Sequence, residues 1–154
     1  MKLAKRLSVL FTVLGLYLAA PSAHATHVGG FLGAENFGFP DTRDGVNHLS
    51  GGFDAAIGDG PLELGGFWQQ AKGTQTLLGG ELLLYPTLTK LIYLEGKAAN
   101  ANLYGSNHFA YGPGAGVNLE VLPGFLSIGV DVTYFFYSGG GHDLSTLGDV
   151  KIWL

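Results

Sequence analysis

The sequence predicts an all-β fold, an eight-stranded antiparallel up-and-down transmembrane β-barrel. The clearest evidence is the stretch 125–137, FLSIGVDVTYFFY, in which one face is wholly apolar and the other carries Ser127, Gly129, Asp131 and Thr133. A period of two is that of a β-strand, and these two faces suit a wall between lipid and a small wet lumen. Other segments repeat the pattern, and no apolar run after residue 25 reaches the length of a membrane helix.

Residues 1–25 read as a secretory signal peptide that precedes a barrel domain, 26–154. Lys2, Lys5 and Arg6 stand before an apolar run that ends in Ala-His-Ala, and the run is shorter than a membrane anchor of about 20 residues. The chain has no cysteine, which excludes disulfides. Without the leader the chain carries 12 acidic and five basic residues, and this negative balance disfavours nucleic acid as a partner.

The first four predicted strands place leucine, phenylalanine or tryptophan outward and place glycine with a carboxylate inward. They span 28–36, 49–57, 62–69 and 76–85. In the last of them Leu77 and Leu83 fall on the inward side and blur the alternation.

The last four predicted strands are 91–99, 109–121, 125–137 and 150–154. The second of these, FAYGPGAGVNLEV, is as regular as 125–137. The final one is short and runs to the end of the chain.

The predicted connections alternate in length, as expected for a barrel that starts from the periplasm. Long or intermediate connections (37–47, 70–75, 100–107 and the glycine-rich 138–148) follow the odd-numbered strands, and short ones (58–61, 86–89 and 122–124) follow the even-numbered strands. A barrel of eight strands has an interior that its own side chains can fill.

The leader, segments such as FAYGPGAGVNLEV and FLSIGVDVTYFFY, and the loop rhythm resemble the small eight-stranded outer-membrane barrels of Gram-negative bacteria, the OmpX-like and OmpA-type membrane domains. This architectural resemblance implies an exported, non-enzymatic protein in contact with outer-membrane lipid. Such barrels end on an aromatic residue, whereas this chain ends in Trp153-Leu154. Either Leu154 replaces the aromatic residue or the register of the last strand is shifted by one.

The first candidate site is a set of inward charges that share one narrow lumen: Glu35, Asp54, Glu63, Glu81, Glu95, Lys97, Glu120, Asp131 and Lys151. Unpaired buried charge costs several kcal/mol, so water, pairing or protonation must intervene. We expect a polar plug in which Lys97 pairs with several acids. The alternative is a narrow, weakly cation-selective, porin-like channel.

Two further candidates are weaker. His48, His108 and His142 lie in or beside predicted outer loops, the last next to Asp143, but they lack the spacing of metal ligands. His48-Leu49-Ser50 resembles the His-x-Ser of outer-membrane lipid A deacylases, although parity turns Ser50 toward the lumen. We therefore predict no catalytic residue and no cofactor, and keep a lipid A-modifying hydrolase as an alternative.

A soluble lipocalin-like ligand-binding barrel is the remaining alternative, because lipocalins also have a leader and eight strands. Its polar face would meet water and should be rich in basic residues, whereas here that face is rich in glycine. We favour a membrane protein with a structural or surface-interaction role, in which loops 37–47 and 138–148 contact an extracellular ligand or surface.

Overall fold

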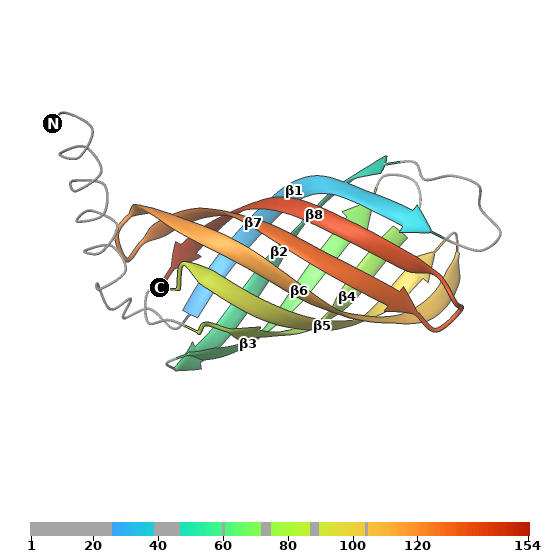
Figure 1. Cartoon of the computed structure of the whole chain (residues 1–154), viewed down its shortest axis with the longest axis horizontal. Helices are drawn as coiled ribbons and strands as arrows, with labels where there is room; N and C mark the ends of the chain where they lie inside the picture. Colours follow the sequence, from blue (N-terminus) through green and yellow to red (C-terminus); the bar gives the residue numbers. More distant parts are fainter. Residues whose placement is uncertain (1–25, 39–46, 60, 72–74, 87–89, 104) are drawn as a thin grey trace, which may run out of the picture.

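The computed structural model describes residues 26–38, 47–59, 61–71, 75–86, 90–103 and 105–154. Eight strands pair antiparallel in chain order, and β8 also pairs with β1, which closes the barrel (Figure 1). They are β1 (Thr26–Gly38), β2 (Asn47–Asp59), β3 (Leu62–Ala71), β4 (Gln75–Leu84), β5 (Ile92–Leu103), β6 (Ser106–Leu122), β7 (Leu126–Tyr137) and β8 (His142–Trp153). The predicted eight-stranded antiparallel up-and-down barrel is confirmed. In this part of the chain no helix is long and apolar enough to span a membrane.

The barrel has two ends that differ in which connections they carry. The start of β1 and the end of β8 lie together, with His27 beside Trp153, and we call this the termini end (Figure 1). The chain also turns there between β2 and β3, β4 and β5, and β6 and β7. The other four connections lie at the opposite end, which we call the far end.

The outward side chains form an apolar belt around all eight strands. On β7, Val130 and Val132 are 47% and 41% exposed, whereas the inward Asp131 and Thr133 are 5% and 0% exposed. A water-soluble monomer rarely exposes so large an apolar surface, while a barrel in lipid requires one. The predicted parity of this strand is confirmed.

Aromatic rings gather on the outer face near the far end. Phe109, Tyr111, Phe136 and Tyr134 form a chain of neighbouring rings with centroids 4.9 to 6.1 Å apart, and His142 stacks on Tyr134 at 5.7 Å. Aromatic girdles of this kind mark the level of the lipid headgroups in membrane barrels.

The predicted last strand, 150–154, is present but begins too late, and the predicted loop 138–148 is too long. β8 already begins at His142, and the β7–β8 turn occupies only 138–141, closed by hydrogen bonds between Tyr137 and the backbone of Gly140 and Gly141. The outward positions Thr146 and Gly148 interrupt the apolar side of β8 between Leu144 and Val150. Gly148 is flanked by Val130 on β7 and Leu32 on β1, whose side chains provide the apolar cover.

The predicted alternation of long and short connections is also not found. The strands β5 and β6 are joined by 104–105, not by the loop predicted over 100–107, whereas the β4–β5 connection at the termini end spans 85–91. Asn100 and Asn102 point outward and are exposed, so the end of β5 lacks the apolar signal although it stays paired with β6. Most of the predicted loop 37–47 lies outside the described residues.

Of the two alternatives for the chain end, the structure has the one in which Leu154 takes the outward position of the aromatic residue. Trp153 is 3% exposed and points into the lumen, where its indole N–H donates to the Ser127 hydroxyl at 3.0 Å. Ile152 and Leu154 face outward. The terminal aromatic residue therefore belongs to the interior.

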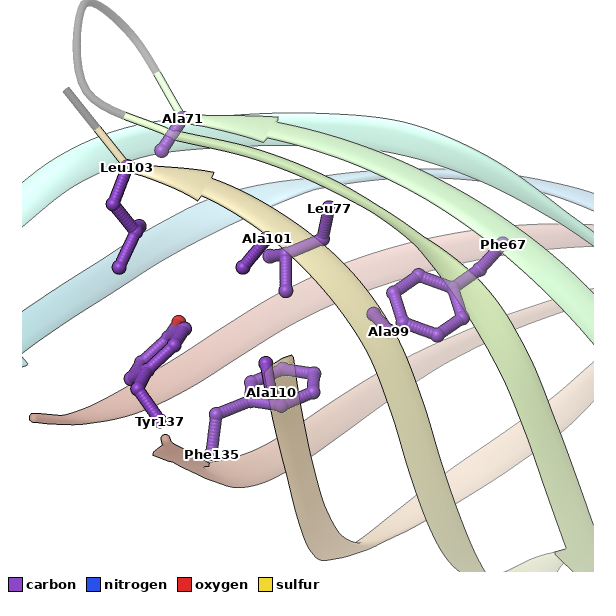
Figure 2. Close-up of a cluster of buried hydrophobic side chains, with 9 residues drawn as sticks. All are labelled: Phe67, Ala71, Leu77, Ala99, Ala101, Leu103, Ala110, Phe135 and Tyr137. Carbon is purple, nitrogen blue, oxygen red and sulfur yellow. The ribbon is translucent and has the colours of Figure 1, made fainter. Parts of the chain in front are cut away.

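Two groups of apolar side chains occupy the lumen, one toward each end. Figure 2 shows the larger group, in which side chains from five adjacent strands converge near the far end: Phe67, Ala71, Leu77, Ala99, Ala101, Leu103, Ala110, Phe135 and Tyr137. The smaller group comprises Ala56, Leu83, Tyr85, Tyr93 and Trp153. Leu77 and Leu83, which blurred the alternation of β4, are therefore lumen-filling residues.

Inward glycines make room for large side chains on the neighbouring strand. Gly116 lies opposite Tyr93 and Gly114 opposite Glu95, and a Cβ on either glycine would overlap the facing side chain. Glycine thus permits a tyrosine or a carboxylate to lie across the narrow lumen.

The apolar belt predicts a steep cost for charge at its centre. Val130→Arg should lower the free energy of unfolding in lipid by about 2 to 4 kcal/mol, because the guanidinium would lie at the middle of the bilayer. Ser106→Arg, at the exposed start of β6, should change it little. Urea unfolding in lipid vesicles measures both, and equal tolerance would contradict a lipid-facing belt.

The close approach at Gly116 predicts a second difference. Gly116→Ala should destabilise the barrel by about 1 to 3 kcal/mol, as overpacking does, because the Tyr93 ring is held by polar contacts and cannot move freely. Gly96→Ala is the matched control, since a Cβ there meets nothing within 4 Å. The same unfolding measurement compares them, and an equal effect would mean that the lumen is loosely packed.

Candidate functional site in the barrel lumen

Eight of the nine predicted lumen residues are at most 7% exposed and lie inside the barrel: Glu35, Asp54, Glu63, Glu81, Glu95, Lys97, Asp131 and Lys151. Glu120 is half-buried at the end of β6, where its carboxylate accepts the N–H of Gly124 from the following turn. The lumen also contains charged groups that the sequence did not single out for it: His27, Lys90, Asp143 and Asp149.

Lys97 lies between two carboxylates. Its Nζ is 3.0 Å from Glu95 Oε1 and 3.3 Å from Asp131 Oδ2. The Thr133 hydroxyl lies against both carboxylates, and Nζ also sits 5.5 Å from the centre of the Phe67 ring. The ammonium thus joins β5 to β7 and borders the apolar group at the far end.

Tyr93 connects this group to a second lysine. The Lys151 Nζ lies 3.5 Å from Asp149 Oδ2 and donates to the Tyr93 hydroxyl at 3.3 Å. The same hydroxyl lies 3.3 Å from Asp131 Oδ2, which Lys97 also contacts. Both lysines therefore belong to one network that spans β5, β7 and β8.

His27 anchors a third group near the termini end. Its Nδ1 is 3.0 Å from Glu63 Oε2, and its Nε2 is 2.9 Å from Asp54 Oδ2. Its ring lies 5.0 Å from that of Trp153. The imidazole, which is fully buried, bridges β2 and β3 from its place on β1.

Lys90 joins this group from the β4–β5 connection. It pairs with Glu63, and its Nζ lies 4.6 Å from the Trp153 ring centre and 5.2 Å from that of Tyr85. Lys90 adopts a φ of 51°, which is uncommon for a side chain other than glycine. Burial, together with the nearby Glu63 carboxylate, raises the pKa of the Tyr85 hydroxyl above its usual value, so Tyr85 remains a neutral donor to Glu63.

Two acids near the far end have a different environment. Glu35 accepts from the Ser50 hydroxyl at 2.8 Å and from the Gln69 amide, and Asp143 accepts from the Tyr137 hydroxyl at 3.5 Å. Neither carboxylate takes part in an ion pair within the described part of the chain. Hydroxyl and amide donors alone support them.

A small cavity of about 20 Å³ remains at mid-lumen, large enough for a water molecule or an ion. Its lining is mostly charged: Phe31, Asp54, Glu81, Leu83, Tyr93, Glu95, Lys97, Asp131, Leu147, Asp149 and Lys151. Charged side chains therefore occupy much of the middle of the lumen.

The three histidines weighed as a weak metal candidate are not brought together. Among the described residues, the side chains close enough to share a metal ion are His27, Asp54 and Glu81, not His48, His108 and His142. His142 faces outward, and His48 and His108 are half-buried on β2 and β6. Asp143, expected beside His142 in a loop, points into the barrel from β8.

The His-x-Ser segment does not present a nucleophile to lipid. Ser50 is 1% exposed and faces the lumen, where its hydroxyl donates a hydrogen bond to the Glu35 carboxylate. A nucleophile needs access to its substrate as well as a base. Burial in the lumen removes that access.

Sequence reasoning missed His27, Lys90 and Asp149 for separate reasons. His27 follows the predicted leader directly, Lys90 lies outside the regular strand pattern, and Asp149 fell in a predicted loop. Residues two apart on a strand share a face. His27 could therefore have been placed on the inward face with Gly29, and Asp149 on the inward face with Lys151.

Comparison with known proteins supports the architecture. No protein-family model and no curated protein sequence matches the chain. Among solved structures, the chain is similar to the crystal structure of Neisserial surface protein A (NspA), with a TM-score of 0.68 and 13% sequence identity over 84% of this chain and 97% of that one. At this identity the similarity extends to the fold alone, an eight-stranded antiparallel barrel.

Proposed function

We propose that this protein is a non-enzymatic, non-conducting integral protein of the bacterial outer membrane. One combination of observations carries the proposal: the outside of the barrel is an apolar belt, and the inside is filled by its own side chains. The first feature suits lipid, and the second argues against a continuous aqueous path. The similarity to the fold of a surface protein supports the same location.

A weakly cation-selective channel is the second candidate, because carboxylates outnumber lysines around the central cavity. The apolar group near the far end argues against conduction. Phe67 and Phe135 lie 6.4 Å apart, and both are buried within that group (Figure 2). To pass, an ion would have to lose its hydration water and cross this group of buried apolar side chains.

The other two alternatives fit the structure less well. A lipocalin-like carrier needs an apolar interior and a polar exterior, the reverse of the arrangement found. A lipid A hydrolase would need Ser50 at the lipid surface, where it does not lie.

In the proposed orientation the leader directs export, the termini end faces the periplasm and the far end faces the exterior. Contacts with an extracellular ligand or surface would then fall to the far-end connections. The segment 37–47 is the longest of these by sequence, whereas 138–148 is largely part of β8. The aromatic rings outside the far end would mark the outer headgroup level.

The filled lumen predicts that the wild-type barrel is silent in planar-bilayer conductance measurements. The double variant Phe67→Ala/Phe135→Ala should admit small cations and raise the conductance clearly above the bilayer background, because it removes two large rings from the apolar group near the far end. Phe53→Ala/Phe136→Ala is the matched control, since these rings face outward from β2 and β7. Steady channel activity of the wild-type protein would favour the channel instead.

A further inference from the structure

We propose that the lumen holds a divalent transition-metal ion, of the class to which zinc belongs, at His27, Asp54 and Glu81. The three side chains come from β1, β2 and β4, and their candidate ligand atoms all lie within 4.8 Å of one another. Asp54 and Glu81 also line the central cavity. The site is therefore deep inside the barrel.

The residues that line the cavity carry more negative than positive charge, which favours a bound cation. Five carboxylates line it, from Asp54, Glu81, Glu95, Asp131 and Asp149, against the two ammonium groups of Lys97 and Lys151. Buried charges without partners are costly, so the excess must be offset by protons or by an ion. A single divalent ion would offset most of it.

The orientation of His27 favours the ion. On one side its Nδ1 lies 3.0 Å from Glu63 Oε2, a contact that fixes the ring when Nδ1 carries the proton. Its Nε2 then faces Asp54. Histidines that bind metals commonly donate their other ring N–H to a carboxylate in this way. The metal would take the place of the Nε2 proton.

Unpartnered oxygens supply the second, independent observation. Asp54 Oδ1 and Glu81 Oε1 are buried without a hydrogen-bond partner within the described structure, and the two residues are only 6% and 4% exposed. An unpartnered carboxylate oxygen in a dry interior is unfavourable, because it has lost its water without replacement. A cation that Asp54 binds through both carboxylate oxygens, and that Glu81 binds through Oε1, would satisfy both.

The geometry requires only a small adjustment. Zinc bonds to nitrogen and oxygen are about 2.0 to 2.2 Å long, so two ligand atoms on one ion lie roughly 3 to 3.5 Å apart. His27 Nε2 and Asp54 Oδ2 are 2.9 Å apart. The Glu81 side chain would move toward them, and the cavity beside it leaves room for the ion. One nitrogen with carboxylate oxygens suits zinc and similar ions better than calcium.

The test measures metal retained by the folded barrel. Because apolar side chains fill the far end of the lumen, the untagged chain 26–154, which contains all eight strands, is folded into detergent micelles with zinc chloride present. Free metal is then removed by gel filtration, and bound zinc is counted by mass spectrometry. Heat-modifiable gel mobility confirms folding. The wild-type barrel should retain about one zinc ion per chain.

Variants assign the ligands. His27→Gln and Glu81→Gln should each retain at least tenfold less zinc, whereas His108→Gln and Glu120→Gln, which alter groups outside the cavity lining, should match the wild type. If His27→Gln fails to fold, Glu81→Gln decides, because the Glu81 oxygen that lacks a hydrogen bond can be replaced without breaking one.

Three results would overturn the proposal. If the folded wild-type barrel retains no more zinc than the background level, protons and not a metal ion neutralise the carboxylates that line the cavity. Undiminished zinc in Glu81→Gln would place the ion elsewhere. Calcium retained in preference to zinc, when the two chlorides compete at equal concentration, would remove His27 from the set of ligands.

Discussion

The arrangement of the lumen depends on the Lys97 ammonium, which lies between Glu95 and Asp131. These three side chains share the middle of a barrel too narrow for bulk water, so each charge relies on the others. Tyr93 extends the group to Lys151 and Asp149 through its hydroxyl. Removal of one partner from a buried ion pair typically costs about 3 to 5 kcal/mol, because the remaining charge is left uncompensated.

The narrow lumen also explains why glycine and large side chains face one another across neighbouring strands. Tyr93 opposite Gly116 and Glu95 opposite Gly114 fill space that two large residues could not share. In the same narrow space, apolar side chains pack together near the far end and a small cavity remains at the centre. A filled interior inside an apolar exterior is the basis of the proposal that the barrel lies in a membrane and does not conduct.

The fold could be predicted from the sequence wherever both faces of a strand carried a strong signal. β7 shows this best, because valine, isoleucine and aromatic residues alternate with Asp131 and Thr133 along most of its length. Only the end of β8 could be recognised, since Thr146 and Gly148 interrupt its outward apolar side and rely on neighbours for apolar cover. Parity identified most of the lumen charges, but the pairing between strands that brings His27 to Asp54 and Glu63 depends on barrel register, which local alternation does not define.

The dependence of the lumen on paired charges is tested most directly by a double-mutant cycle between Lys97 and Asp131, measured by urea unfolding in lipid vesicles at neutral pH. Lys97→Met alone should lower the free energy of unfolding by about 3 to 5 kcal/mol. Addition of Asp131→Asn should recover part of that loss, with a coupling energy of about 0.5 to 3 kcal/mol. Two small and strictly additive effects would contradict the account, because they would mean that water, and not pairing, compensates the charges in the lumen.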